Sequence, residues 1–577
     1  MDQAPAGPRT ATSQPDGTWS DVAGTYPPIP VAIAWPSVPH LLQSVVALCL
    51  LYGTVLATYR ITCHPLAAIP GPRLAAATFW YEIWFDVVRW GRYTHEIKRM
   101  HEVYGPIIRI NPDEVHCSDP NFINTLYGSG GKRRDKSSLF VAGFPSDLQL
   151  GGFGTLDHDH HRTRRSAASR HFSRAQIQKL ERMAHAAAQR LCDKFLAHRR
   201  HGPFDIAAAY SCYTADIISE YCFGEPFGFL RQPGWDPNFR EAVYAMFHLI
   251  HIMRHFPFVA WLVDRVPMSV INAVSENIGA LAYHSKVKLP MMVRQAKAAY
   301  NAGLQMNQNT VLFSLLSSNL PAEEKTEERL SGEANVFLAA GTETTATALS
   351  LCTYHLLKNP EIVAKTRAEL LAVVKNPEAL PDWLVLERLP YLTAVIKETL
   401  RLMYGLSSRL PRIAPDEDVL YQGTWIPPAM TQAVSVRHVI PRGYAIGMSA
   451  YLVHTDERLF PNPAKFAPER WLLRDGRKDR RLERYLLTFS RGSRQCLGMQ
   501  YVFAIPSVVT QFMHPADRRA FDRLAYCELY IAVAALILKA TDNMRLFDTT
   551  DADVVYDFDL ALGMPKRGGK GIRVNMS

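Results

Sequence analysis

The sequence lacks the patterns that mark several common classes of protein. Its 577 residues include nine cysteines, but these form no Cys-x-x-Cys pair and no regular spacing. A chain of this length needs no disulfides to hold its core together, so we expect the cysteines to be reduced. Internal repeats and linker-like segments are also missing after the first 40 residues. Residues 60–577 are therefore expected to form one large domain.

Clustered charge is missing as well. The chain carries 64 lysine and arginine residues against 54 aspartate and glutamate residues, a formal net charge of +10. The basic residues are dispersed and are not interleaved with aromatic residues, which is unlike a nucleic-acid-binding module. The positive charge indicates either a solubility effect or a basic surface that attracts an acidic partner.

Charged residues are absent from one apolar run, residues 41–59. As a helix rising about 1.5 Å per residue, this run is long enough to cross a bilayer core, and we predict a transmembrane anchor. The preceding residues 1–40 are expected to be disordered. Arg60, His64 and Arg73 follow the run, so the positive-inside rule predicts a single pass with the remaining chain in the cytosol. A cleaved signal peptide and a buried core helix are the alternatives.

The segment 489–498 carries the strongest chemical signal. It reads Phe-Ser-Arg-Gly-Ser-Arg-Gln-Cys-Leu-Gly, in which Cys496 can serve as a thiolate ligand to haem iron. Thiolate ligation favours cleavage of the O–O bond, whereas imidazole ligation favours reversible binding or electron transfer. Gly492 and Gly498 are expected to let the backbone approach the sulfur closely and direct N–H groups at it. The alternative is a buried structural cysteine.

This segment matches the haem-loop pattern Phe-x-x-Gly-x-Arg-x-Cys-x-Gly at all five fixed positions. The chain therefore resembles the cytochrome P-450 superfamily, of the fungal microsomal type. The resemblance implies a mainly α-helical fold with a small β-sheet region, and haem b bound through Cys496 as the axial iron ligand. It also implies that Phe489 covers the sulfur side of the ring and that Arg494 pairs with a haem propionate.

Three residues match a structural network of the same family. Glu398 and Arg401, in Glu-Thr-Leu-Arg, lie on one helical face, although such a pair alone is usually a solvated surface ion pair. Arg470 follows in Phe-Ala-Pro-Glu-Arg-Trp. By resemblance, Glu398, Arg401 and Arg470 form a structural triad behind the haem that takes no part in the chemistry.

A helix expected over residues 333–357 contains Ala-Gly-Thr-Glu-Thr-Thr at residues 340–345, which resembles the family's distal helix segment. Glycine inside a helix costs about 1 kcal/mol relative to alanine, so Gly341 is interpreted as a kink that makes room for oxygen. The resemblance implies that Thr344 hydrogen-bonds oxygen and that Glu343 relays protons to it. This acid and alcohol pair favours an oxygenase over relatives that rearrange their substrates.

A basic stretch, His-Arg-Thr-Arg-Arg at residues 161–165, occupies the place of the family's Trp-x-x-x-Arg, with histidine replacing tryptophan. By resemblance, Arg165 and His161 are expected to meet the haem propionates, and Arg412 is a further candidate. The alternative is a solvated basic surface.

The resemblance also implies a partner and a substrate class. Electrons are expected from NADPH through NADPH-cytochrome P-450 reductase, an acidic flavin-containing protein, and the enzyme is expected in the endoplasmic reticulum membrane. The substrate is expected to be a hydrophobic small molecule in contact with Phe337, Ala340 and residues 139–153 and 406–410.

A narrower resemblance concerns Phe85, Tyr93 and residues 111–114, which are similar to fungal secondary-metabolite members such as the trichodiene oxygenases. It implies a role in terpenoid or polyketide biosynthesis.

Apolar spacing predicts the remaining secondary structure. Helices are expected over Gln176–His198, Ala207–Tyr221, Glu241–Ile252 and Trp383–Arg401. A small sheet is expected over Ile107–Ile110, Val115–Cys117 and Ser449–Leu452.

Two segments depart from the family pattern. After Cys496 the matching residues resume at Leu524, which leaves residues 501–523 extra, and Pro506 within them disrupts a helix interior by about 3 kcal/mol. Residues 429–442 are likewise extra, because the family pattern joins Pro428 directly to Gly443. We interpret both segments as either real insertions or retained introns.

Three functional hypotheses follow. The first is a membrane-bound monooxygenase that inserts one oxygen atom from O2 into an apolar molecule. The second is a haem-thiolate isomerase or dehydratase that uses no external electrons, and the third is an inactive haem-binding product of a mis-spliced message. Thr344 and Glu343 favour the first.

Overall fold

The computed structural model describes residues 38–128, 131–169, 174–308, 310–428, 430–499 and 524–577. The chain divides into two compact units, residues 1–55 and residues 56–577. Helix α1 (Val38–Thr62) runs across their boundary. The disorder predicted for residues 1–40 falls mostly outside the described residues, and so does the extra segment 501–523.

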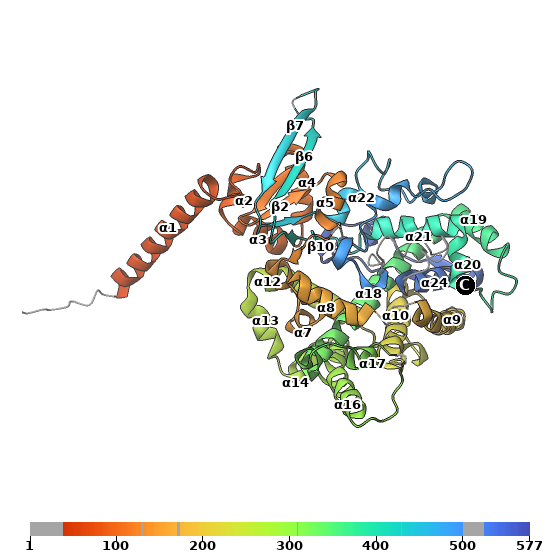
Figure 1. The fold of residues 1–577 in the computed structure, drawn as a ribbon. Coiled ribbons are helices and arrows are strands. Elements are labelled where there is room, and N and C mark those ends of the chain that lie inside the picture. Colours follow the sequence, from red (N-terminus) through yellow and green to blue (C-terminus); the bar gives the residue numbers. More distant parts are fainter. Residues whose placement is uncertain (1–37, 129–130, 170–173, 309, 429, 500–523) are drawn as a thin grey trace, which may run out of the picture. The chain divides into compact units, whose positions relative to one another are not determined.

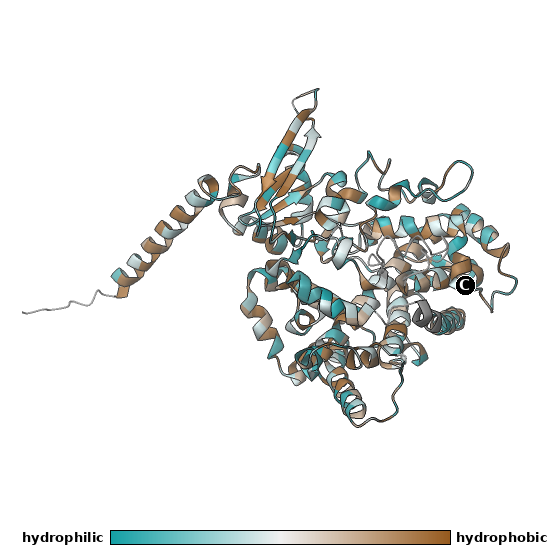
Figure 2. Ribbon diagram, in the orientation of Figure 1, coloured by the Kyte–Doolittle hydropathy of each residue, from teal (hydrophilic) through white to brown (hydrophobic). Residues whose placement is uncertain are grey.

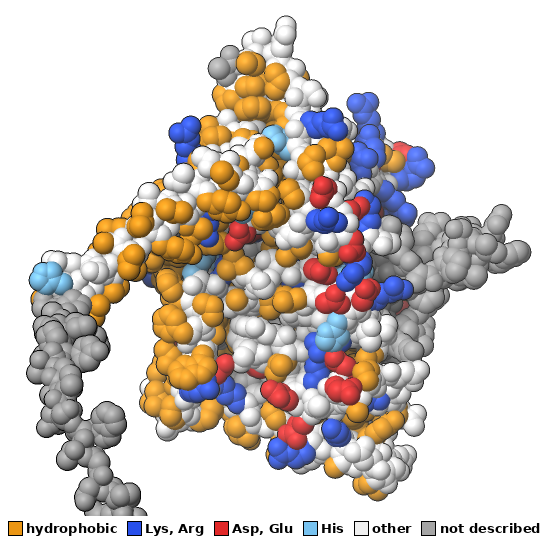
Figure 3. All heavy atoms as spheres, turned by 60° about the vertical axis from the view of Figure 1, so that its left-hand side comes forward, with side chains coloured by type: hydrophobic (Ala, Val, Ile, Leu, Met, Phe, Trp, Pro, Cys, Tyr) orange, Lys and Arg blue, Asp and Glu red, His pale blue; other side chains and the backbone are white. Residues whose placement is uncertain are grey.

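Helix α1 contains the predicted anchor and extends it by three residues at each end. None of its residues is buried, and it is long and apolar enough to cross a membrane. Figure 3 shows hydrophobic side chains over most of its visible surface. These features are consistent with a membrane anchor.

The larger unit is mainly helical with small sheets, as predicted (Figure 1). Its longest described helix, α18 (Glu327–Lys358), begins after Thr326, whose side chain accepts a hydrogen bond from the backbone N–H of Arg329. The helix ends before Pro360, which cannot continue it. It packs against α10 (Ile206–Phe223), α16 (Leu289–Asn301), α21 (Pro390–Met403) and α24 (Leu524–Lys539).

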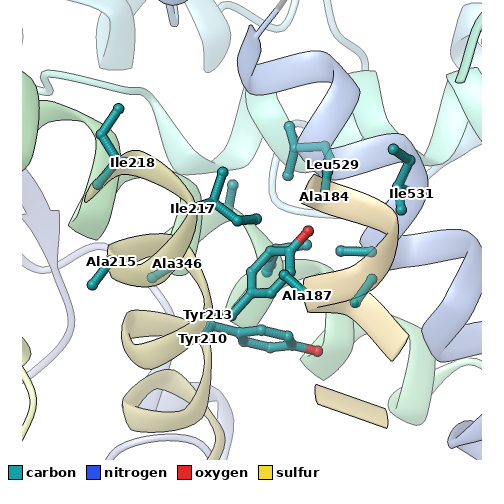
Figure 4. Packing of buried hydrophobic residues seen from close by; sticks show 14 of the residues in the cluster. Ala184, Ala187, Tyr210, Tyr213, Ala215, Ile217, Ile218, Ala346, Leu529 and Ile531 are labelled. Atoms are coloured by element: carbon teal, nitrogen blue, oxygen red, sulfur yellow. The ribbon is translucent and has the colours of Figure 1, made fainter. Parts of the chain in front are cut away.

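The packing of α9 (Arg174–Ala197), α10 and α24 forms a central part of the hydrophobic core. Figure 4 shows Tyr210 and Tyr213 of α10 beside the small side chains Ala184 and Ala187 of α9, with Leu529 of α24 nearby. Small residues let the helices approach closely at the density of a protein interior. This packing fixes α24, the helix that follows residues 489–498 in the described chain.

Two predicted helices are confirmed and two are divided. Residues 176–198 and 207–221 match α9 and α10. The helix predicted over 241–252 is split into α11 (Arg240–His248) and α12 (Ile250–His255). The helix predicted over 383–401 is split into α20 (Trp383–Arg388) and α21, because Pro390 starts a new helix after Leu389.

The remaining α-helices are short and surround this core. In Figure 2, the polar helix α8 (teal) contrasts with the apolar α24 (brown). The shorter helices are α2 (Arg73–Ala77), α3 (Trp80–Ile83), α4 (Tyr93–Tyr104), α5 (Ile123–Tyr127), α6 (Ser138–Val141), α7 (Ser146–Leu150), α8 (His158–Ser169), α13 (Pro257–Asp264), α14 (Met268–Val274), α15 (Glu276–Tyr283), α17 (Val311–Leu316), α19 (Pro360–Leu371) and α22 (Ala450–His454).

The main sheet has five short strands in the order β1-β2-β8-β5-β3, with β2 and β8 parallel and the other pairs antiparallel. Its strands are β1 (Ile107–Asn111), β2 (Glu114–Cys117), β3 (Asp135–Lys136), β5 (Arg412–Ile413) and β8 (Ala445–Gly447). The first two predicted strands are confirmed. The strand predicted over Ser449–Leu452 is wrong, because the apolar run that begins as β8 turns at Ser449 into helix α22.

A separate hairpin contains most of the extra segment 429–442. Strands β6 (Val419–Trp425) and β7 (Val434–Ile440) pair antiparallel, with Val419 opposite Ile440. Residues 434–440 of this segment are therefore built into regular structure. The other small sheets use β4 (Phe204–Asp205), β12 (Arg573–Met576) and β9 (Met544–Leu546), and β10 (Phe558–Leu560) with β11 (Leu562–Met564).

Candidate active site

Residues 489–498 form a tight loop that lies between α22 and α24 in the chain. The backbone N–H of Cys496 donates to the carbonyl of Phe489 at 2.9 Å, and that of Gln495 donates to the carbonyl of Gly492 at 3.1 Å. These bonds close the loop, and the side chain of Cys496 is exposed. Phe489 packs on the central core, with its ring 5.4 Å from that of Tyr526 on α24.

The structure explains the two glycines of the loop differently. Gly492 has a φ of 74°, and a Cβ there would lie 1.7 Å from the carbonyl oxygen of Tyr127. A Cβ on Gly498 would lie 3.6 Å from the sulfur of Cys496, which is an ordinary contact. A Cβ on Gly498 would therefore not obstruct the approach of the backbone to the sulfur. Gly492 is required by its neighbour Tyr127 and by its own left-handed backbone.

The exposure of Cys496 separates it from the other cysteines beyond residue 100; the exposed Cys63 directly follows α1. The six other cysteines beyond residue 100 are all buried. Burial raises the pKa of Cys527 well above its ordinary value, and Glu181 and Glu528 add to the shift. Cys527 therefore remains a thiol, and Cys496 is the one suited to bind a ligand as a thiolate.

The predicted basic residues come together beside this loop. Arg165 donates from Nη1 to the carbonyl of Gln495 at 2.6 Å. Arg412 donates to the carbonyl of Pro411 at 3.0 Å. Arg494 is held by three backbone carbonyls, those of Arg134, Thr155 and Leu156. His161 is buried among Arg494 and Arg165.

Sequence reasoning missed a fifth member, Lys136. Its buried ammonium donates to the carbonyl of Phe153 and lies 3.8 Å from the centre of that ring. Lys136 ends a basic run in which Lys132 pairs with Glu417 on the surface at 3.0 Å. Nothing in the local sequence distinguishes the two lysines. We call Lys136, His161, Arg165, Arg412 and Arg494 the cationic cluster.

Among the described residues, no ion pair joins Lys136, Arg412 or Arg494 to a carboxylate. Burial and Arg412 lower the pKa of Arg494 to about 10, outweighing Asp135 and Asp157. Burial, with Arg412 and Arg494, holds the pKa of Lys136 well below its ordinary value. Burial and the neighbouring arginines also lower the pKa of His161 strongly, so its imidazole is neutral. Uncompensated buried cations of this kind fit an anionic ligand.

On α18, packing gives a reason for Gly341 that does not depend on the predicted kink. The helix is continuous from Glu327 to Lys358, and a Cβ on Gly341 would lie 2.6 Å from the side chain of Ile218 on α10. The glycine therefore lets the two helices approach closely. Thr344 donates from its hydroxyl to the carbonyl of Ala340 at 2.7 Å, and Ala340 is exposed.

Glu343 lies on another side of the same helix. It is fully buried, and its Oε1 accepts a hydrogen bond from the hydroxyl of Ser211 at 2.7 Å. Arg240 on α11 lies 3.7 Å from Oε2. Burial raises the pKa of Glu343, and Arg240 opposes this effect. Among the described contacts, the carboxyl of Glu343 and the hydroxyl of Thr344 are not joined directly.

Glu398, Arg401 and Arg470 meet in one buried network. Glu398 accepts bonds from Arg401 at 2.8 and 2.9 Å and from Arg470 at 3.0 Å. Trp471, which sequence reasoning missed, donates its indole N–H to Glu398 at 2.9 Å. Glu398 and Arg401 are fully buried, so removing one partner would leave an uncompensated charge in the core.

The segments predicted to contact a substrate meet in an apolar cluster. Phe140, Phe144 and Leu148 pack with Leu406 and Leu410, and the rings of Phe144 and Phe153 lie 4.9 Å apart. Phe337 packs in the larger core instead. Sequence reasoning missed two further members, Ile250 on α12 and Ala561 after β10. Both come from distant parts of the chain and carry no local motif.

Comparison with known proteins identifies the family. A family model described as "Cytochrome P450" matches residues 70–505. A cytochrome P450 monooxygenase of Metarhizium majus, ppzE, is 45% identical over 451 residues, which cover 76% of this chain and 93% of the relative. The monooxygenase tpcC of Cochliobolus heterostrophus is 35% identical, with 95% and 99% covered. The tryptophan 6-hydroxylase fscE of Fusarium equiseti is 37% identical, with 90% and 94% covered.

This family implies a haem cofactor, a small-molecule substrate and a redox partner. The residues present fit haem, because an exposed cysteine lies in a tight loop beside the cationic cluster. A soft thiolate suits iron, and paired cations suit the two carboxylates of the ring. The chain therefore belongs to the cytochrome P450 family, among the fungal monooxygenases of secondary metabolism.

Proposed function

We propose that the protein is a membrane-anchored haem-thiolate monooxygenase with Cys496 as the axial iron ligand. Haem ligated by a thiolate supplies the activation of O2, one atom of which is inserted into an apolar small molecule. Electrons come from NADPH through a flavin-containing reductase. The observation that carries the proposal is the contact of Arg165 with the carbonyl of Gln495, which joins the cationic cluster to the residue beside Cys496.

The cationic cluster binds the haem propionates in this proposal. Arg494, Arg412 and Lys136 supply charge, and charge-assisted hydrogen bonds to carboxylates are about twice as strong as neutral ones. His161 is neutral, so it contributes one N–H donor and no charge. The departure from the family's tryptophan therefore leaves a hydrogen-bond donor at this position.

Thr344 and Glu343 hold and move protons. The hydroxyl of Thr344 donates a hydrogen bond to the carbonyl of Ala340. It can rotate to donate toward the haem side of α18 instead. Glu343 has a raised pKa and can carry a proton at Oε2, facing Arg240, whose side chain is 24% exposed. Protons reach the site from solvent past Arg240 and Glu343 and are delivered by Thr344 through intervening water.

The test of this function is expression with a fungal NADPH-cytochrome P450 reductase in microsomes. We expect a red-shifted absorption band in the reduced carbon monoxide complex, and product formation that requires both NADPH and O2. Conversion of substrate without NADPH would instead support a haem-thiolate isomerase or dehydratase. Haem-free protein, or haem-bound protein without turnover, would support an inactive product.

We propose that the anchor holds the enzyme in the endoplasmic reticulum membrane with the catalytic domain in the cytosol. Exposed apolar residues of the large unit support contact with lipid, since Trp80, Trp84, Phe258 and Trp261 are each at least half exposed. The ring of Trp80 lies 6.4 Å from Phe256, which joins the two groups. We expect alkaline carbonate to leave the protein in the membrane, and protease added to intact microsomes to digest it beyond residue 62.

The apolar cluster around Phe140 and Phe144 supports a hydrophobic substrate from fungal secondary metabolism, of the terpenoid or polyketide class. The names of the relatives favour a second candidate class. They include the tryptophan 6-hydroxylase and an N-acetyltryptophan 6-hydroxylase of Emericella nidulans, 34% identical, which favours an aromatic indole substrate. Another relative is the conidiogenone synthase of Penicillium rubens, 36% identical. Product analysis with both substrate classes, with the reductase supplied, separates them.

A further inference from the structure

We propose that His454 is a positioning residue that holds the thiolate loop against the end of α21. The proposal rests on the proposed role of Cys496 as the haem ligand. His454 is the last residue of α22 and is fully buried. It belongs to neither the haem loop nor the triad, yet it hydrogen-bonds Arg401 of the triad and Leu487, two residues before the haem loop.

The ring of His454 bridges two backbone groups. Its Nε2 accepts a hydrogen bond from the backbone N–H of Leu487 at 2.8 Å. Its Nδ1 lies 2.8 Å from the carbonyl oxygen of Arg401. Because the amide of Leu487 can only donate and the carbonyl of Arg401 can only accept, the ring must carry its proton on Nδ1. Both ring nitrogens are thus committed, in one tautomer.

His454 also binds Arg401 in the opposite direction. The guanidinium of Arg401 donates to the backbone carbonyl of His454 at 3.0 Å, while its other nitrogens hold Glu398. A continuous set of buried hydrogen bonds therefore runs from Glu398 through Arg401 and His454 to Leu487. Buried sets of this kind fix the relative placement of the segments they join.

The segment that His454 holds leads directly into the thiolate loop. The carbonyl of Leu487 accepts the N–H of Ser490 at 2.7 Å, and the carbonyl of Phe489 accepts the N–H of Cys496 at 2.9 Å. Leu487 is therefore the first fixed point of the turn that carries the sulfur. A shift of its backbone moves Phe489 and, through it, the amide of Cys496.

The contact also completes the end of α21. The last carbonyls of a helix have no partner within it. Here the carbonyl of Leu400 accepts the hydroxyl of Thr488 at 2.7 Å, and that of Arg401 accepts His454. A Cβ on Gly405 would lie 2.1 Å from the carbonyl oxygen of Thr488, so the two segments are closely packed. The thiolate loop is thereby aligned by the end of this helix.

The surroundings keep the ring neutral, so that Nε2 stays an acceptor. Tyr404 and Phe460 flank the ring at 6.0 and 6.3 Å between centroids. Burial lowers the pKa of His454 to about 3.

The experiment separates the two contacts by substitution in the full-length, membrane-bound protein. In His454→Asn, the side-chain amide can replace Nδ1 and donate to Arg401, but it is too short to reach Leu487. In His454→Gln, the amide oxygen can take the place of Nε2 and accept from Leu487. Each variant gives up one contact, so the two should lose similar thermal stability.

The measured quantity is the fraction of bound haem that shows the red-shifted band in its reduced carbon monoxide complex. We expect His454→Asn to lower this fraction about tenfold, within the range seen for residues that orient metal ligands. We expect His454→Gln to keep most of it. Total haem content and far-ultraviolet circular dichroism identify variants that have folded.

His116→Asn is the matched control. His116 is also fully buried and makes two hydrogen bonds, to His101 at 2.7 Å and to Ser449 at 3.0 Å, near the other end of α22. It should lose stability and keep the parental band fraction.

Three results would overturn the positioning role. The first is a parental band fraction in folded His454→Asn. The second is an equal loss of band fraction in folded His454→Asn and His454→Gln. The third is an equal loss of band fraction in His116→Asn. If His454→Asn does not fold, the result for His454→Gln decides. A folded His454→Gln that lacks the red-shifted band overturns the positioning role, and one that retains the band supports it. Retention of the band by Cys496→Ser would instead overturn the proposed function.

Discussion

Two buried groups of charge lie in the large unit, and their environments differ. In the described part of the cationic cluster, Lys136, Arg412 and Arg494 form no salt bridge with a carboxylate, and burial and Arg412 lower the pKa of Arg494. Elsewhere, Arg409 pairs with Glu82 and with Glu114 at 2.8 Å, and the pKa of Arg409 rises well above its ordinary value despite burial. We call the second group, completed by Asp86, His251 and Arg254, the ion-pair network.

The contrast indicates what each group is for. In the ion-pair network every charge meets an opposite one, so it joins the segment around Glu82, strand β2, helix α12 and the turn before β5. Removing a partner would damage the fold. In the cationic cluster the cations bind backbone carbonyls but repel one another. We propose that an anionic ligand, the haem propionates, offsets this repulsion.

The largest effect is expected from replacing Cys496, the proposed iron ligand beside the cationic cluster. Cys496→Ser should abolish the red-shifted band of the reduced carbon monoxide complex, because a hydroxyl does not replace a thiolate on iron. Cys527→Ser, which alters the buried thiol, should keep it. Difference spectra of reduced microsomes give the result, and a band retained in Cys496→Ser removes that residue as the ligand.

Arg409→Met should be strongly destabilising, because it leaves Glu82 and Glu114 buried without a cation. The expected loss in the free energy of unfolding is about 3–5 kcal/mol. Arg458→Met is the control, since Arg458 is 79% exposed and pairs with Asp456 at the surface, where such pairs contribute less than about 1 kcal/mol. Denaturant unfolding monitors both, and similar losses would contradict the distinction.

Lys136→Met should have the opposite effect from Arg409→Met, lowering haem affinity without lowering the stability of the apoprotein. Removing one of several repelling cations should leave the apoprotein as stable as before or more so, while haem affinity falls about tenfold through the lost charge-assisted contact. Lys132→Met, from the same basic run, removes a surface pair with Glu417 and should change neither quantity. Haem titration of the apoprotein and its thermal midpoint are measured together. A destabilised apoprotein with unchanged haem affinity would show that Lys136 is structural.

Thr344→Ala tests a site that belongs to neither group of charge. Its neighbour Glu343 is buried and lies near the cation of Arg240. Haem and substrate should still bind, but several-fold more NADPH should be diverted to hydrogen peroxide, because the group that directs the proton is lost. Thr347→Ala, on the same helix, is the matched control and should stay coupled. The ratio of product to NADPH consumed decides, and an unchanged ratio in Thr344→Ala removes it from proton delivery.

Deletion of residues 429–442 should have the smallest effect. Ile426-Pro427-Pro428 would then replace Ile440-Pro441-Arg442 before Gly443, so that Ile426 comes opposite Val419 and Gln422-Gly423 form a two-residue turn. We expect haem content and thermal midpoint close to those of the parent. Loss of haem in the shortened form would show that the hairpin supports the site.

Short sequence motifs identified the charged residues of the site better than the residues that pack around them. Glu398, Arg401 and Arg470, named from short patterns, lie in contact. Trp471 and His454 were not singled out, because their roles depend on which backbone groups reach them after folding. The packing role of Gly341 was missed for the same reason, since its neighbour Ile218 is distant in sequence.

Periodicity predicted the long helices well and the short elements less well. Helices α9 and α10 were found because their apolar spacing continues over many residues. The apolar run at residues 445–453 gave no sign that it changes from strand to helix at Ser449. Lys136 was missed because burial of a lysine is decided by tertiary packing.

The repulsion within the cationic cluster has a consequence for the level of the enzyme in the cell. A ligand that binds the folded state stabilises it by mass action, and the unfolded fraction of a marginal protein is exposed to proteolysis. Because burial and the neighbouring arginines act against the charges of Arg494 and Lys136, newly made chains gain stability when haem arrives. Abundance of the enzyme is therefore expected to follow the supply of haem, and chains made during iron limitation should be degraded first.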